Sequence, residues 1–265
     1  RRVVGRREGA RRDRHRPGRD GGEGAAQRDT SHAGDRASRS RRGGLIQRQG
    51  VADDGRDSGV RGDTRTRHDL TDRETSGIIL IAKHAAAASL SQTAMERRWV
   101  SKTYYAILKG ELREPVQVDQ SLGPDETSKV VVKTAVRVGP GTSPAATFFE
   151  PALVRGGYTL ARVSPHTGRK HQIRAHALWL GHPVIGDKLY GGDDSLYLEF
   201  VEQGWTERLG QSLEMERQAL HAARLDFRAP LFQRIFRAPL APDMRAFVLS
   251  KMGVSESELD AILAV

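Results

Sequence analysis

The segment from Ser164 to Gly191 limits the possible folds most, because it brackets one short apolar helix with a start signal and a stop signal. Thr167 supplies a hydroxyl for free backbone N–H groups, and Gly168 allows the sharp bend of a capping turn. Gly181 followed by Pro183 is typical of a helix C-terminus. The segment therefore predicts a helix that begins at this capping turn and ends at the glycine.

The predicted helix has an apolar side and a basic side. Ile173, Ala177 and Leu180 follow one another at helical spacing, which predicts a buried stripe. Basic and polar side chains fill the first two turns: Arg169, His171, Gln172 and Arg174. Backbone amides and the helix dipole favour an anion at this end, so a phosphate or a carboxylate is expected there. The alternative is a surface helix whose basic side chains lie in water.

The formal net charge of the 265-residue chain is +10, which favours a nucleic-acid partner, but the excess charge is unevenly distributed. Residues 1 to 70 contain 19 Arg, no Lys and 11 acidic residues, a balance of +8. The remainder has 24 basic and 22 acidic residues, a balance of +2. The later part is only mildly basic, so RNA binding there depends on where its arginines lie.

Residues 1 to 70 also differ from the rest in hydrophobic pattern. They contain no aromatic residue, and their sparse apolar residues follow neither a helical nor a strand period. Such a segment buries too little surface to offset its ordering entropy, so we expect disorder up to residue 70. Two interpretations are open: a basic arm that follows RNA phosphates, or a non-native segment read in the wrong frame of a GC-rich gene.

Several classes of protein are disfavoured by the sequence. No cysteine is present, which excludes disulfides and suits a reducing compartment. The apolar run from Ile78 to Ala82 is far too short to cross a bilayer, and no signal segment opens the chain. We expect a cytoplasmic monomer without membrane contact. Four histidines, His166, His171, His176 and His182, match no helical pair of metal ligands, so neither a metal nor a cofactor is expected.

From Thr75 onward the pattern alternates short strands with helices. Strands are expected at 78–82, 102–108, 130–138, 146–153, 158–163 and 219–227, with the Gly-Pro-Gly turn at 139–141 joining the third strand to the fourth. Helices are expected at 85–98, at 193–210 and within 242–265. Several strands in succession with irregularly interspersed helices predict an α+β fold with a mixed, mainly antiparallel sheet.

The central sequence TGRKHQIRAH, followed by LGHPVIGDKLYG, resembles the third motif of the RluA-type pseudouridine synthases, which usually reads TGRTHQIRVH and then GHPIVGDPLYG. Asp72 to Gly77 (DRETSG) resembles the catalytic loop of that family, and Lys102 to Gly110 resembles its KxYxAxxxG strand. Arg217 to Ala222 resembles its RQALHA segment. The resemblance covers residues 72 to about 230. It implies the pseudouridine synthase fold, a sheet with flanking helices and a catalytic cleft, in a domain of residues 71–265 that lacks the usual N-terminal strand VVDKPAG.

The resemblance implies an enzyme that isomerises uridine to pseudouridine in ribosomal or transfer RNA. Of these, large-subunit ribosomal RNA is the substrate that we favour. It implies Asp72 as the catalytic carboxylate, Arg174 as its partner and Tyr104 against the uracil ring. Basic residues near these three are expected to contact RNA: Arg73, Lys102, Arg169, Lys170 and His171. Without the resemblance, Asp72 fits a turn residue and Tyr104 a core residue of its strand.

The sequence immediately before Asp72 departs from the family pattern. The family usually reads HRLDRxTSG, whereas here Leu70 replaces the Arg and Thr71 replaces the Leu. In relatives that Arg is associated with prising the target base out of its stack. The rival interpretation is therefore a catalytically silent RNA-binding protein with a damaged N-terminal half, whose missing strands leave a sheet edge unpaired.

Overall fold

The computed structural model describes residues 45–49, 72–230 and 232–264. These residues belong to one unit, Arg42–Val265. Most of the segment expected to be disordered lies outside the described residues, and so do Leu70 and Thr71. Within the described ranges, no helix is long and apolar enough to cross a bilayer.

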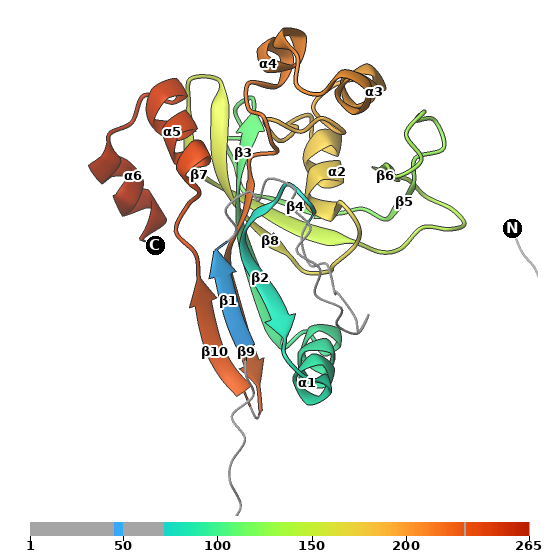
Figure 1. Ribbon diagram of the computed structural model, residues 1–265, viewed down its shortest axis with the longest axis vertical. Coiled ribbons are helices and arrows are strands. Elements are labelled where there is room, and N and C mark those ends of the chain that lie inside the picture. The colour runs from blue at the N-terminus through green and yellow to red at the C-terminus, as the bar shows by residue number, and fades with distance from the viewer. Residues whose placement is uncertain (1–44, 50–71, 231, 265) are drawn as a thin grey trace, which may run out of the picture. The chain divides into compact units, whose positions relative to one another are not determined.

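Eight strands form a mixed sheet in the described part of the chain, in the order β1-β2-β9-β3-β8-β7-β4, with β10 beside β9 (Figure 1). The strands are β1 (Leu45–Gln49), β2 (Ser76–Ala82), β3 (Val100–Lys109), β4 (Val116–Asp119), β7 (Ala146–Arg155), β8 (Tyr158–Pro165), β9 (Leu220–Ala229) and β10 (Phe232–Arg237). A separate pair consists of β5 (Leu122–Pro124) and β6 (Thr134–Val136). Neighbouring strands are antiparallel, except that β2 runs parallel to β9. The expected α+β class with a mainly antiparallel sheet is confirmed.

Helices flank this sheet at its ends and along one face. They are α1 (Ala85–Glu96), α2 (Gln172–Trp179), α3 (Asp194–Gln203), α4 (Glu207–Leu213), α5 (Pro242–Lys251) and α6 (Glu256–Leu263). Figure 1 shows α1 at one end of β2, α5 beside α6 near β7, and α3 and α4 next to each other above α2. The expected final helix pair within 242–265 is present as α5 and α6.

Two hydrophobic clusters hold the sheet. The larger surrounds β3, whose residues 106–108 are fully buried, and includes side chains from α2, α5 and α6. The predicted stripe of α2 contributes here, because Ile173 and Ala177 are buried in this cluster and Leu180 lies against it. A fully buried side chain such as Leu contributes roughly 1.5–3 kcal/mol of stability. The smaller cluster lies between α1, β2, β9 and β10. The larger cluster thus packs α2 against the strands of the sheet.

The expected strand at 130–138 is wrong in extent and in pairing. Only β6 forms, and it pairs with β5 instead of β7. Val131 is 94% exposed, because it lies in a turn that the hydrogen bond from Lys133 N to Val130 O (2.9 Å) closes. The carboxylate of Asp194 accepts hydrogen bonds from Lys129 N (2.8 Å) and Lys133 Nζ (2.9 Å). These long-range contacts outweigh the strand propensity of the valine run.

Two helix boundaries also differ from expectation. The helix expected at 193–210 is divided, because Gly204 ends α3 with a φ of +73° and the hydroxyl of Thr206 caps α4. The helix expected to begin at Thr167 begins later, at Gln172. The Thr167 hydroxyl donates to Gln172 Oε1 (2.6 Å) and so does not cap the helix.

Four of the described strands were not expected: β1, β4, β5 and β10. β1 lies in the segment for which we expected disorder, and it pairs antiparallel with β2. β4 pairs with β7, and β10 forms a hairpin with β9. These strands have only three to six residues, too few for a period of two to stand out in the sequence.

Candidate active site

One cavity, with a volume of about 470 Å³, is lined by all eight site residues named from the sequence. They are Asp72, Arg73, Lys102, Tyr104, Arg169, Lys170, His171 and Arg174. The walls come from the turn at residues 72–75, from β3 and from the segment that leads into α2. Three segments that are distant in the sequence therefore converge on the same space.

Asp72 lies in a turn directly before β2, which a hydrogen bond from Thr75 N to Asp72 O (3.0 Å) closes. Its side chain is 24% exposed. Gln218 supports this turn, because its Nε2 donates to Thr75 Oγ1 (2.7 Å) and lies 3.4 Å from Asp72 Oδ2. Gly77 then brings β2 against β9. Its φ is +104°, and a Cβ there would lie 2.3 Å from Ala222 O, so this position requires glycine.

Arg174 is buried in the first turn of α2 and binds two carboxylates. Its Nη1 donates to Asp72 Oδ2 (2.7 Å), while Nε and Nη2 donate to the two oxygens of Asp187 (2.6 and 2.7 Å). Burial by itself would lower the pKa of Arg174, but Asp187 and Asp72 raise it above its ordinary value. The guanidinium therefore stays charged, and its planar fork fixes the direction of the Asp72 carboxylate.

Three residues of this network were not predicted from the sequence: Asp187, Tyr190 and Gln218. Asp187 is fully buried and accepts from the backbone N–H groups of Leu189 and Tyr190 (both 3.0 Å). The ring of Tyr190 lies 4.9 Å from the guanidinium carbon of Arg174. The available signal was their position within the family-like strings GDKLYG and RQALHA.

Tyr104 is buried on β3 at the edge of the cavity. The register between β3 and β9 shifts between Thr103 and Tyr104, an irregularity that can re-aim a side chain. Burial and the negative charge of Asp72 raise the pKa of Tyr104 to about 12. The hydroxyl therefore keeps its proton at neutral pH.

His171 lines the cavity beside the carboxylate of Asp72, and its side chain is 12% exposed. It adopts the left-handed backbone conformation, with a φ of 55°. Its Nδ1 lies 3.1 Å from Tyr190 Oη, and its Nε2 lies 3.6 Å from Asp72 Oδ1. Burial lowers the pKa of His171 to about 4; Asp72 opposes this shift, and Arg174 and Lys170 add to it. The imidazole is therefore neutral at physiological pH.

This pKa shift predicts acid sensitivity. Because the pKa of His171 is about 4 in the folded protein and 6.5 as its ordinary value, the unfolded state binds more protons between these limits. The free energy of unfolding should therefore fall as the pH is lowered through this window. Urea unfolding at about pH 7.5 and about pH 5 should show a smaller loss on acidification for His171→Gln than for the wild type. Equal losses in both proteins would contradict the assignment.

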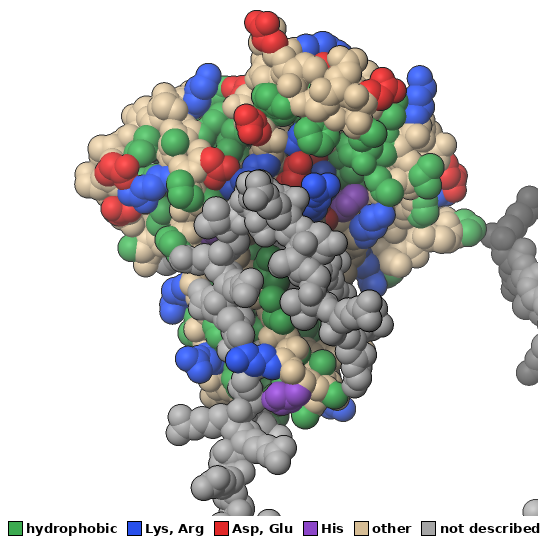
Figure 2. Space-filling model, viewed as in Figure 1, with side chains coloured by type: hydrophobic (Ala, Val, Ile, Leu, Met, Phe, Trp, Pro, Cys, Tyr) green, Lys and Arg blue, Asp and Glu red, His purple; other side chains and the backbone are tan. Residues whose placement is uncertain are grey.

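The remaining basic residues give the cavity an excess of positive charge. Arg73, Arg169 and Lys170 are exposed, whereas Lys102 is half-buried and its pKa is lowered by burial. Among the described residues, the Lys102 ammonium has no hydrogen-bond or ion-pair partner. It lies close to Gly168, where a Cβ would be 3.4 Å from Nζ. On the face shown in Figure 2, basic, acidic and histidine side chains lie close together. An anionic group of a ligand would complete the coordination of this lysine.

Comparisons with known proteins point to one family. A family model described as RNA pseudouridylate synthase matches residues 64–179. The RNA pseudouridine synthase YjbO of Bacillus subtilis is 35% identical over 204 residues, which are 75% of this chain and 63% of YjbO. The ribosomal large subunit pseudouridine synthase D of Vibrio cholerae is 32% identical over 182 residues, 68% of this chain and 53% of that protein.

A solved structure is also similar. The human RNA pseudouridylate synthase domain containing 1 aligns with a TM-score of 0.52 and 26% sequence identity, over 74% of this chain and 78% of that chain. This chain spans about half to two thirds of the length of the two curated relatives. The family match includes the Asp72 turn, the strand that carries Tyr104 and the helix that carries Arg174. Over these segments the chain is similar in sequence and in fold to the RluA-type RNA pseudouridine synthases.

Proposed function

We propose that this chain isomerises uridine to pseudouridine in RNA, with Asp72 as the catalytic group. The observation that carries the proposal is a carboxylate in a basic cavity, paired at 2.7 Å with the buried Arg174 and close enough to Tyr104 to raise its pKa. The reaction breaks the bond between ribose C1′ and uracil N1 and joins C1′ to C5. It requires a group that attacks or takes a proton near the sugar or the base, and an oriented carboxylate suits this task.

The cavity suits a single nucleotide turned out of its stack. Its volume of about 470 Å³ lies in the usual range for ligand sites. We assign Tyr104 to the uracil ring, because it is a buried aromatic side chain that lines this cavity. Because its hydroxyl is protonated at neutral pH, we assign it as a relay that passes the C5 proton on to Asp72, and not as an anionic base. Attack by Asp72 at C1′, attack at C6 and abstraction of a ribose proton are all compatible with this placement.

Large-subunit ribosomal RNA is the substrate we propose, because the Vibrio cholerae relative is named for it. Release of tritium from RNA labelled at C5 of uridine measures the reaction, with large-subunit ribosomal RNA and bulk transfer RNA in parallel. Release from ribosomal RNA supports both parts of the proposal. Release from transfer RNA alone overturns the substrate. RNA binding without release from either RNA overturns the activity and favours a catalytically silent RNA-binding protein.

Lys102→Met is expected to weaken RNA binding with less effect on turnover at saturating RNA. The Lys102 ammonium lies in the cavity without a partner in the described part of the chain, so it is suited to a phosphate of the bound nucleotide. The KM for RNA should rise, and the slope of log KM against log salt concentration should fall by about 0.7, the loss of one phosphate contact on a single strand.

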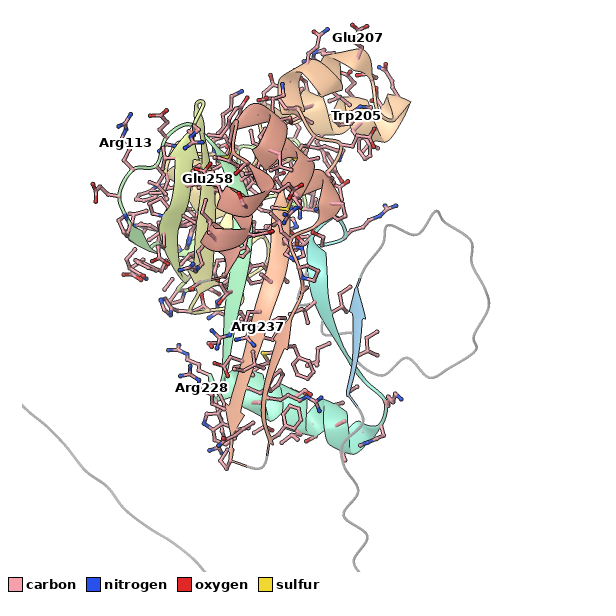
Figure 3. All side chains as sticks on the ribbon, turned by 90° about the vertical axis from the view of Figure 1, so that its left-hand side faces the viewer. Arg113, Trp205, Glu207, Arg228, Arg237 and Glu258 are labelled. Atoms are coloured by element: carbon pink, nitrogen blue, oxygen red, sulfur yellow. The ribbon has the colours of Figure 1, made fainter. Side chains whose placement is uncertain are left out.

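The matched control is Arg228→Gln at the opposite end of β9 from Leu220, which lines the cavity (Figure 3). Like Lys102→Met, this variant removes one positive charge. The side chain of Arg228 is 72% exposed, so the substitution should not disturb the fold. It should leave the salt dependence unchanged. The same decrease of slope in both variants would show that Lys102 acts only through the overall charge.

A further inference from the structure

A second ion pair, between Lys188 and Glu74, contacts the Asp72 turn, and neither of its residues lines the cavity. Lys188 Nζ donates to both carboxylate oxygens of Glu74 (2.9 and 3.0 Å) and to the backbone oxygen of Glu216. The side chain of Lys188 is only 5% exposed. An ammonium has three donors, so all three are satisfied.

The ammonium of Lys188 also faces two aromatic rings. Its Nζ lies 4.5 Å from the ring centroid of Phe200 in α3 and 5.6 Å from that of Trp205. Trp205 belongs to the connection between α3 and α4, as Figure 3 shows. Lys188 therefore joins the α3–α4 pair to the turn that carries Asp72.

Glu74 is the point at which this contact reaches the turn. Glu74 is two residues after Asp72, within the turn that the hydrogen bond from Thr75 N to Asp72 O closes. Its backbone oxygen accepts from Arg217 Nη1 (3.3 Å). The side chain of Glu74 is thus held by Lys188 and its backbone by Arg217. An ion pair with one buried and one partly exposed partner adds little to stability, so a role in geometry is the more informative one to test.

We propose that Lys188 is a positioning residue for the reaction: its ion pair with Glu74 holds the Asp72 turn so that the carboxylate stays in its productive direction. This inference rests on the proposed function. Lys188 does not line the cavity, so its removal should leave RNA affinity unchanged. A displacement of about 1 Å at a reacting group can cost on the order of 10²-fold in rate. The loss should therefore appear in kcat and not in KM.

Lys188→Met provides the first test, in the tritium-release assay with kcat and KM measured separately. We expect kcat to fall by about 10-fold to 10²-fold and KM to stay within about twofold. Glu74→Gln keeps an acceptor for Lys188 without its charge and should show a smaller loss of kcat. The double variant should be no slower than Lys188→Met, because both changes break one contact. A rise in KM at unchanged kcat would overturn the proposal.

The matched control is Arg208→Gln, which breaks an ion pair with Glu199 in the same α3–α4 pair but away from the turn. The side chain of Arg208 is 55% exposed, and this variant should keep the wild-type kcat. If Lys188→Met does not fold, Glu74→Gln takes its place in every comparison.

Hydrogen–deuterium exchange in the absence of RNA separates this proposal from the proposed function. The backbone amides of residues 72–76 should exchange faster in Lys188→Met than in the wild type, while Arg208→Gln should match the wild type. If the wild type releases no tritium from any RNA, the activity is wrong and exchange still decides whether Lys188 holds the turn. Unchanged exchange in Lys188→Met would overturn the positioning role.

Discussion

Asp72→Asn is expected to reduce tritium release from C5-labelled RNA by about 10⁴-fold or more, the range found when an essential catalytic side chain is removed. Asparagine has nearly the same shape, but it carries no negative charge with which to attack the nucleotide or take a proton. The fold should survive, because Arg174 keeps both hydrogen bonds to Asp187. RNA affinity should stay close to that of the wild type, since the substitution removes only one acidic group and the cavity remains basic.

The control for this prediction is Asp260→Asn on α6, which removes an exposed carboxylate that does not line the cavity. It should retain wild-type release. Thermal unfolding and RNA binding of both variants show whether any loss is specific to the chemical step. Substantial release by Asp72→Asn would exclude Asp72 as the catalytic group, whatever the effect on binding.

Arg174→Met is expected to abolish activity and to lower the free energy of unfolding by about 3–5 kcal/mol, the cost of leaving a buried charge without its partner. Asp187 is fully buried, and Arg174 holds it with two of its nitrogens. The same substitution frees the carboxylate of Asp72 from the hydrogen bond that directs it. Stability and activity therefore fall together, for two separate reasons.

The double variant Arg174→Met, Asp187→Asn separates these two reasons. Asparagine removes the buried charge but keeps an oxygen that accepts from the backbone N–H groups of Leu189 and Tyr190. Urea unfolding should show that part of the lost stability returns, while tritium release stays absent because Asp72 still has no arginine. Recovery of release together with stability would mean that Arg174 supports only the fold.

The sequence predicted the parts of this site that lie in continuous motifs. Asp72, Tyr104 and Arg174 came from three family-like segments, and the structure brings their side chains to one cavity. Their catalytic roles remain proposals, and the variants above test those of Asp72 and Arg174. The apolar stripe of α2 was also predictable, because burial of a helix follows a local period.

Partners that lie far apart in the sequence were not predictable. Glu74 and Lys188 are 114 residues apart, and neither residue has a local pattern that names the other. The valine run at 130–132 fits a strand by propensity, yet Asp194, more than 60 residues later, holds the adjoining residues in a turn. His171 was expected only to contact RNA, because its position beside Asp72 depends on the left-handed backbone before α2, which the sequence does not reveal.

The long sequence separation within the Asp72 network has a consequence for synthesis on the ribosome. Arg174 and Gln218, which orient Asp72 and its turn, follow it by 102 and 146 residues. At about 5–20 residues per second, the second of these partners is made roughly 7 to 30 s after Asp72. During that interval the nascent chain carries the carboxylate without its supports, so the catalytic geometry arises only after Gln218 has been made.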